Sequence, residues 1–210
     1  MTVGVIMPAY NAATSIRRAL DSLRSQALQP AEIVVVDDGS VDETAAIAAA
    51  FGPPVRVLHR DRGGPAAARN SGVNACTAEA IAFLDADDSL PPESLAARAD
   101  FLEQNPSVQA VFGQVVFGGR AVPAWLPGGL LVRRSAMVRL GPFDESLRAG
   151  EFIDWLDRAR RAGLSEALLP IVVLVRDTAG GGRHATRDRA QDFARMARNL
   201  LARRRGGLPP

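Results

Sequence analysis

The sequence predicts an α/β protein in which a mostly parallel sheet carries helices on both of its faces. Three observations support this prediction. Short β-branched runs alternate along the chain with alanine-rich segments of helical spacing. The runs are continuously apolar, as strands are when both faces of their sheet are buried. Each run ends in a polar cluster, so that strand and helix patterns alternate as in a Rossmann-like fold.

Four strands are expected in the first part of the chain. Their apolar runs lie at residues 3–7, 32–36, 55–58 and 81–84. Pro8 follows the first run directly, and because proline has no N–H to donate, we expect the strand to end there.

Helices are expected between these strands. The first begins after Thr14 or Ser15, either of which can cap a helix. The second follows Asp42 and continues up to Phe51, and the third spans residues 65–76. Strands joined by helices in this way predict parallel pairing.

Composition limits the class of protein. The chain has 210 residues, which is enough for one ordinary α/β domain with a substantial core. A hydrophobic content of 47% and a charged content of 23% are typical of globular proteins and exclude a disordered chain. The net charge is only +2, and we expect no nucleic-acid partner.

Targeting signals are not recognisable in the sequence. No apolar stretch reaches about 18 residues, and no basic region with a cleavage site opens the chain. The single cysteine, Cys76, excludes an internal disulfide and is expected to fill space in the core. We therefore expect a cytoplasmic protein.

The polar clusters at the strand ends predict a ligand site. They read "PAYN", "DDGS", "HRDRGG" and "DADD" in chain order. "DDGS" or "DADD" alone is equally typical of an aspartate-rich turn. In open α/β sheets, however, ligands bind beyond the carboxyl ends of the strands. Four clusters at four successive strand ends therefore indicate one shared site.

The cluster "DADD" determines the expected chemistry. Asp85, Asp87 and Asp88 repel one another unless a cation or protons neutralise them. Oxygen ligands without a nearby cysteine or histidine suit Mg²⁺ or Mn²⁺, which bind substrate phosphates as well. A nucleotide diphosphate is the expected ligand, although the chain has neither a Walker sequence nor a GxGxxG fingerprint.

The ordered motifs "PAYN", "VDDGS", "AARNSG" and "DADD" resemble those of the family 2 glycosyltransferases, which have the GT-A fold. The similarity continues through "GGLLVRRSAMVRLGPFDE" and "GEFIDWLDRARRAGL", which look like the acceptor-side segment and the acidic catalytic motif of that family. The resemblance implies that a sugar is transferred with inversion from a nucleotide-diphosphate sugar, most often a UDP-sugar, to a hydroxyl acceptor.

The resemblance also implies a nucleotide-sugar pocket. In it, Asp38 accepts a hydrogen bond from uracil, Asp37 supports Asp38, and Arg69 approaches the base or the phosphates. The DxD motif consists of Asp85 and Asp87 around Ala86. The implied pocket residues are Pro8, Ala9, Tyr10, Asn11, Asp37, Asp38, Arg69, Asp85, Ala86 and Asp87.

Mn²⁺ or Mg²⁺ is the implied cofactor. Its candidate ligands are Asp87, Asp85 and Asp88, without a choice among them, and His184 in the loop after the last core strand. Many relatives carry a histidine and an asparagine in this loop, where the simple register here gives Ala179 and Gly182. His184 replaces that histidine only if the loop shifts.

An inverting transfer needs a carboxylate base for the acceptor hydroxyl. Glu151 is the first candidate and Asp154 the alternative. The family usually has two adjacent acids here, whereas this chain has Phe152 after Glu151. A purely structural explanation is that both acids favour the first turn of a helix. Trp155 is expected to lie in the core.

Domain limits and the remaining partners follow from the same pattern. We expect one GT-A domain at 1–182, with a nucleotide-sugar half at 1–90 and an acceptor and catalytic half at 91–182. Residues 183–210 are expected to form an arginine-rich helix. This tail packs on the domain or on a second copy in a homodimer, or it binds anionic lipid at the inner face of a membrane.

Two other functions remain open at this point. One is a sugar-nucleotide-binding relative with weak or no turnover, which the departures at residue 152 and in the last loop favour. The other is a nucleotidyltransferase, which also uses paired acids on an α/β sheet. That class needs a glycine-rich basic loop after the first strand, and "PAYNAATS" is not one.

Overall fold

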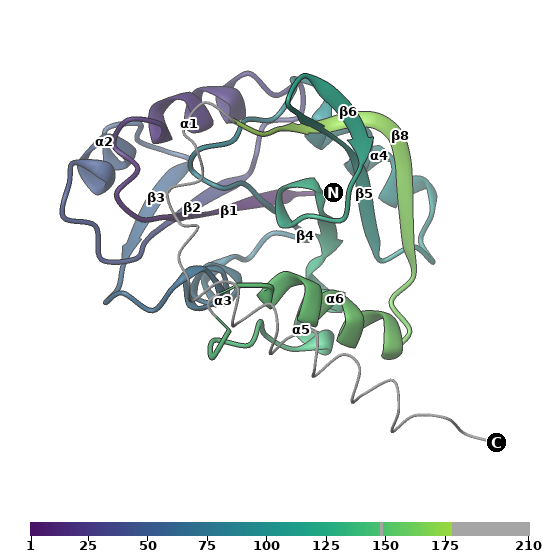
Figure 1. The fold of residues 1–210 in the computed structure, drawn as a ribbon. Coiled ribbons are helices and arrows are strands. Elements are labelled where there is room, and N and C mark those ends of the chain that lie inside the picture. The colour runs from purple at the N-terminus through teal and green to yellow at the C-terminus, as the bar shows by residue number, and fades with distance from the viewer. Residues whose placement is uncertain (148, 178–210) are drawn as a thin grey trace.

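The computed structural model describes residues 1–147 and 149–177. Within them an eight-stranded sheet lies between two layers of helices (Figure 1). The strands are hydrogen-bonded in the order β3-β2-β1-β4-β7-β5-β6, and β8 pairs with β5 beside this path. They are β1 (Val3–Ala9), β2 (Glu32–Asp37), β3 (Val55–His59), β4 (Ala80–Phe83), β5 (Ala110–Phe117), β6 (Arg120–Pro123), β7 (Leu131–Arg133) and β8 (Glu166–Val175).

The first four strands are parallel, as predicted. β1 pairs with both β2 and β4, and β2 pairs with β3. The prediction that Pro8 ends β1 is wrong, because the strand continues through Ala9 with Pro8 opposite Val36 of β2. The β4 register ends earlier, at Ile6 opposite Phe83, so Pro8 does not interrupt that ladder.

The second half of the sheet makes it mixed. β7 lies antiparallel between β4 and β5, and β6 is the antiparallel partner of β5. β8 runs parallel to β5 with two register shifts. The mostly parallel sheet of the prediction is therefore confirmed for the half that precedes "DADD", and an antiparallel insertion follows it.

Helices cover both faces of the sheet, as predicted. The helices are α1 (Ile16–Arg24), α2 (Thr44–Ala49), α3 (Pro65–Ala75), α4 (Ser94–Gln104), α5 (Arg134–Leu140) and α6 (Glu151–Arg161), with a 3-10 turn η1 (Pro127–Gly129). The core against α1, α2 and α4 contains Val5, whereas the core against α3, α5 and α6 contains its neighbour Ile6. This alternation explains why the strands read as continuously apolar.

Local expectations have mixed outcomes. Cys76 is a buried free cysteine, and Trp155 is fully buried in the aromatic part of the core, as predicted. The second helix ends at Ala49 rather than at Phe51. Ser15 precedes the first helix, but its hydroxyl donates to the carbonyl of Ala12 instead of capping a helical N–H.

The approach of α3 to the sheet is unusually close. A Cβ added at Gly72 would lie 2.3 Å from Cγ2 of Ile6. Glycine therefore lets the helix rest directly on β1, and this contact sets the position of the α3 side chains at the carboxyl end of the sheet. In the part of the chain described, no helix is long and apolar enough to span a membrane.

Candidate functional site

The loops after β1 and β2 are joined by their own polar side chains. Asn11, with a φ of 47°, accepts the N–H of Val41 through its side chain and donates its own N–H to Ser40. The N–H of Asp38 donates to the carbonyl of Ala9. The "PAYN" and "DDGS" clusters therefore form one continuous surface, as the strand order requires.

Asp38 is buried and organises the next loop. It accepts hydrogen bonds from Arg60 at 2.7 Å, from the N–H of Gly63 at 3.0 Å and from the N–H of Gly64 at 2.7 Å. Its neighbour Asp37 is buried too and accepts the N–H of Ser40. These bonds fix the backbone that leads into α3, and the predicted uracil contact of Asp38 stays a prediction.

Tyr10 presents an aromatic surface at this edge. The guanidinium of Arg62 lies 3.9 Å from the centre of its ring and donates a 2.7 Å hydrogen bond to its hydroxyl. Arg62 is exposed, so the pair forms a planar, partly charged platform beside the loops. Such a surface is chemically suited to a planar base.

Arg69 connects two acidic motifs that are distant in sequence. Its NH1 group donates to Glu151 at 2.5 Å and its NH2 group donates to Asp85 at 2.7 Å. Burial lowers the pKa of Arg69, but the charges of Asp85 and Glu151 outweigh burial and raise it above the usual value. Its Nε is buried without a hydrogen-bond partner among the described residues.

The "DADD" carboxylates lie in three different environments. Asp85 is partly exposed and paired with Arg69, Asp87 is exposed, and Asp88 is only 3% exposed. Burial, together with the charges of Asp85 and Asp87, raises the pKa of Asp88 to about 7, although Arg176 and the N–H of Asp177 act against this. The predicted repulsion is thus relieved in part by arginines.

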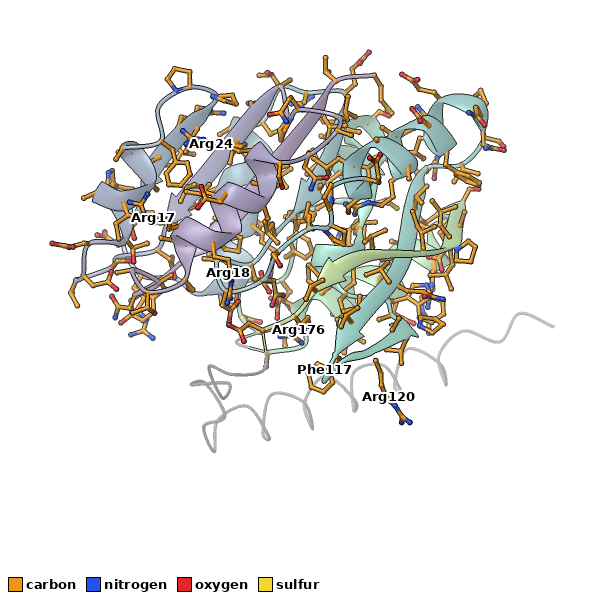
Figure 2. The ribbon with its side chains drawn as sticks, turned by 90° about the horizontal axis from the view of Figure 1, so that it is seen from above. Arg17, Arg18, Arg24, Phe117, Arg120 and Arg176 are labelled. Carbon is orange, nitrogen blue, oxygen red and sulfur yellow. The ribbon has the colours of Figure 1, made fainter. Side chains whose placement is uncertain are left out.

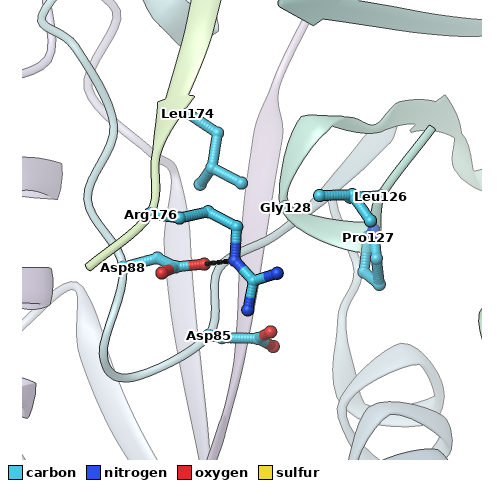
Figure 3. Close-up of a pocket in the computed structure, with 7 residues that line it drawn as sticks. All are labelled: Asp85, Asp88, Leu126, Pro127, Gly128, Leu174 and Arg176. Atoms are coloured by element: carbon cyan, nitrogen blue, oxygen red, sulfur yellow. Dashed lines mark ion pairs between the residues drawn. The ribbon is translucent and has the colours of Figure 1, made fainter. Parts of the chain in front are cut away.

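Asp85 and Asp88 face one small pocket of about 50 Å³ (Figure 3). Leu174 and Arg176 border it at the end of β8, and the opposite wall belongs to residues 126–128 around η1. The Nε of Arg176 lies 3.5 Å from Oδ2 of Asp88. Two carboxylates and one arginine therefore border the pocket on the side that faces η1.

A divalent cation fits these donors only in part. Among residues 1–147 and 149–177, no group of three His, Cys, Asp or Glu side chains is arranged to hold a metal ion. Asp85 and Asp88 nevertheless offer carboxylate oxygens to one pocket. One or two carboxylates plus substrate phosphates are a usual site for Mg²⁺.

The two candidate bases are separated by the structure. Glu151 is the first residue of α6, follows Gly150 at a φ of 79°, and is held against Arg69 beside Asp85. Asp154 is buried and pairs with Arg158 one turn later on the same helix at 2.9 Å. Glu151 is thus joined to Asp85 of the acidic loop through Arg69, whereas Asp154 pairs with Arg158.

The motif residues identify the family. The sequence pattern described as "Glycosyl transferase family 2" matches residues 4–152, which include "DDGS", "DADD" and Glu151. The chain belongs to glycosyl transferase family 2. The resemblance drawn from the four motifs is thereby confirmed.

Family 2 relatives are longer than this chain. The pre-mycofactocin glycosyltransferase of Mycobacterium tuberculosis is 32% identical over 206 residues, which cover 83% of this chain and 42% of that protein. The succinoglycan biosynthesis protein ExoO of Rhizobium meliloti is 44% identical over 95 residues, 44% of this chain and 27% of that protein. The chain spans less than half the length of these curated relatives.

Solved structures confirm the GT-A fold. TarS of S. aureus in complex with UDP-GlcNAc superposes with a TM-score of 0.78 at 22% identity, over 96% of this chain and 67% of that one. The mannosyltransferase PcManGT of Pyrobaculum calidifontis, in complex with GDP-Man and Mn²⁺, superposes with a TM-score of 0.73 at 26% identity, over 99% of this chain and 65% of that one.

Phe152 explains one departure from the family 2 pattern. Its ring stacks on Trp155 at 5.9 Å and meets Phe112 edge-on at 6.4 Å, in the core under α6. A carboxylate at this position would be buried among aromatic rings. The chain therefore uses the position for packing and keeps one acid, Glu151, at the site.

Two arginines of the site were missed by sequence reasoning. Arg18 of α1 pairs with Asp177 at 2.7 Å and donates to the carbonyl of Asp87 at 2.6 Å. Arg176 lines the pocket (Figure 3). The end of β8 is another carboxyl end of a strand, and that signal could have identified Arg176. His184 lies outside the described residues.

Proposed function

We propose that the chain transfers a sugar from a nucleotide-diphosphate sugar to a hydroxyl acceptor, with inversion and with help from a divalent metal. UDP-linked and GDP-linked donors are both supported by similarity, because the structural neighbours were solved with UDP, with UDP-GlcNAc and with GDP-Man. The sequence motifs favour UDP. Residues 1–182 are the proposed catalytic domain.

The bridge made by Arg69 is the single observation that carries this proposal. It holds Glu151 and Asp85 on one buried guanidinium, although Arg69 and Glu151 are 82 residues apart in sequence. A base candidate and a DxD carboxylate are thereby placed at the same edge of the sheet. Two acids on one buried arginine need a reason, since burying ion pairs contributes little to stability.

The proposed step uses Glu151 as a general base. Its carboxylate takes the proton of the acceptor hydroxyl while the hydroxyl oxygen attacks the anomeric carbon from the face opposite the diphosphate. The bond between the anomeric carbon and the diphosphate oxygen breaks, and the nucleotide diphosphate leaves with the electron pair. Arg69 fixes the orientation of Glu151 during this transfer.

Asp85, Asp88 and Asp87 are the residues proposed to hold Mn²⁺ or Mg²⁺. The bound metal would supply positive charge to the leaving diphosphate as a Lewis acid. The platform of Tyr10 and Arg62 is proposed to lie against the nucleotide base. The acceptor is unassigned, and the proposals of a homodimer or of membrane contact through 183–210 concern residues outside the described part.

A donor screen tests the proposed function. Purified protein is incubated with UDP-sugars and GDP-Man, with and without Mn²⁺, and release of the nucleoside diphosphate is measured. We expect metal-dependent release, with NMR showing the inverted anomer in any product. Pyrophosphate release from a nucleoside triphosphate and a sugar phosphate would instead identify a nucleotidyltransferase. Binding without turnover, across several acceptors, would identify a sugar-nucleotide-binding protein.

A further inference from the structure

The end of β8 is attached to the acidic loop by its backbone. Val175 and Ser89 exchange two hydrogen bonds, of 2.8 and 3.0 Å, between their N–H and carbonyl groups. The N–H of Asp177 donates to Oδ1 of Asp88 at 3.2 Å. These contacts hold the backbone of Arg176 at the pocket, so its side chain is placed there by the fold.

The guanidinium of Arg176 is only partly engaged. Its contact with Asp88 uses Nε at 3.5 Å, and the side chain is 39% exposed. Figure 3 shows the two terminal nitrogens turned into the space between Asp85 and η1. Within the described part of the chain these nitrogens have no hydrogen-bond partner. Arg18, by contrast, uses both of its terminal nitrogens, on Asp177 and on the carbonyl of Asp87.

A half-free guanidinium beside two carboxylates can change partners. The guanidinium group of arginine can bind two oxygens of a phosphate at once. A diphosphate also carries more negative charge than the single carboxylate of Asp88. The long contact with Asp88 therefore competes poorly with an arriving diphosphate. A metal ion that neutralises Asp88 would remove the competing partner altogether.

We propose that Arg176 binds the diphosphate of the donor, and that it neutralises Asp88 only while the donor and the metal are absent. This inference rests on the proposed function, since it assigns a new residue to the same site. It predicts that Mn²⁺ and Arg176 compete for Asp88 when no nucleotide is present. It also predicts that Arg176 contributes to UDP binding through phosphate and not through the base.

Calorimetry on three variants tests this role. R176Q removes the charge, R176K keeps a charge without the fork, and R120Q is the matched control. Arg120 is an exposed arginine on the β5–β6 hairpin and does not line the pocket (Figure 2). Each protein is titrated with Mn²⁺ alone, with UDP in the presence of Mn²⁺, and with uridine, which lacks phosphates. Thermal melting confirms that each variant is folded.

The expected pattern is specific to the phosphates. For R176Q we expect UDP affinity to fall at least about tenfold, the scale of one charge-assisted contact. R176K should recover part of this loss, uridine binding should not change, and Mn²⁺ alone should bind more tightly. R120Q should match the wild type in all three titrations.

Three results would overturn the inference. They are UDP binding by R176Q within twofold of the wild type, an equal loss for uridine, and unchanged binding of Mn²⁺ alone. If the wild type transfers sugar and one of these results appears, only the role of Arg176 is lost. If the wild type binds no UDP in the presence of Mn²⁺, the proposed function fails and this inference fails with it.

Discussion

Arg69 is the residue on which the site geometry depends most. Its side chain is buried, and its two terminal nitrogens hold one acid of the loop after β4 and one at the start of α6. Removing one partner of such a buried group leaves the other charge without compensation, which is costly. The arrangement therefore specifies where Glu151 points, and it separates Glu151 from Asp154, which is held by its own helix.

The assignment of the base is tested by two isosteric variants. E151Q should lower the turnover rate by about 10²–10⁴-fold, because an amide cannot take the proton from the hydroxyl of the acceptor. D154N removes a structural ion pair with Arg158 and should keep turnover within a few-fold of the wild type. Release of UDP is measured at a saturating concentration of UDP-sugar. The reverse ranking of the two variants would make Asp154 the base.

At the scale of elements, α3 is the part that aligns the site with the sheet. Gly72 brings it against Ile6 of β1, and Asn70 fastens it to the segment before α6 by exchanging hydrogen bonds with the backbone of Phe143. Both contacts come from the motif "AARNSG". Its arginine forms the site, while its asparagine and glycine place the helix.

G72A tests this packing. A methyl group at residue 72 overlaps the side chain of Ile6, which is fully buried. We expect a loss of about 1–3 kcal/mol in the free energy of unfolding, the usual cost of overpacking. N74A, on the exposed face of the same helix, is the control and should be neutral within about 0.5 kcal/mol. Equal stability in urea denaturation would contradict the close contact.

Glu32 joins β2 to the turn between α3 and β4. Burial by itself raises the pKa of this carboxyl, but hydrogen bonds from the N–H groups of Thr77 and Ala78 and from Arg56 outweigh burial and lower it from 4.5 to about 2. Because the pKa in the folded state is depressed, the stabilisation is present above pH 4.5. It is lost as the pH falls from 4.5 towards 2.

E32Q tests this pH dependence. At pH 7 the variant should be less stable than the wild type by about 2 kcal/mol, and the difference should shrink as the pH falls below 4.5. Denaturant titrations between pH 7 and pH 3 measure it. E93Q is the control, since Glu93 is exposed and makes no ion pair among the described residues. A difference that is constant across this pH range would contradict the assignment.

At the scale of the whole molecule, several segments of the chain together form the site at one edge of the sheet. The ends of β1, β2 and β4, the start of α3, the start of α6 and the end of β8 all contribute to it. Ligand binding to such an edge should stabilise the entire domain by mass action, because a site built from both halves of the chain exists only in the folded state.

Melting temperature reports this coupling. UDP together with Mn²⁺ should raise it by several degrees, and EDTA should abolish the rise. Asp87 is exposed, so D87A should melt like the wild type without ligands but show a smaller rise with them. A full rise in D87A would remove Asp87 from the metal site, and a rise that EDTA does not affect would contradict the role of the metal.

Much of the site could be predicted because strand ends can be read locally. An apolar run that stops at "DDGS" or "DADD" predicts a strand. It also predicts that the polar residues after the run lie at the carboxyl edge of the sheet. Arg176 was missed because its position beside Asp88 depends on the pairing of Val175 with Ser89, which the sequence does not show. The sequence did not predict that Phe152 lies in the core, because the motif around it suggests an acid at this position.

The sequence alone determined the parallel half of the sheet, the helices on both faces, the family and the set of candidate acids, because these depend on periodicity and on residues adjacent in the chain. Only the tertiary structure decided which acids share Arg69, that Asp154 belongs to its own helix, and that Arg176 borders the pocket. These are contacts between distant segments, and their geometry arises only when the sheet and its two helix layers have packed.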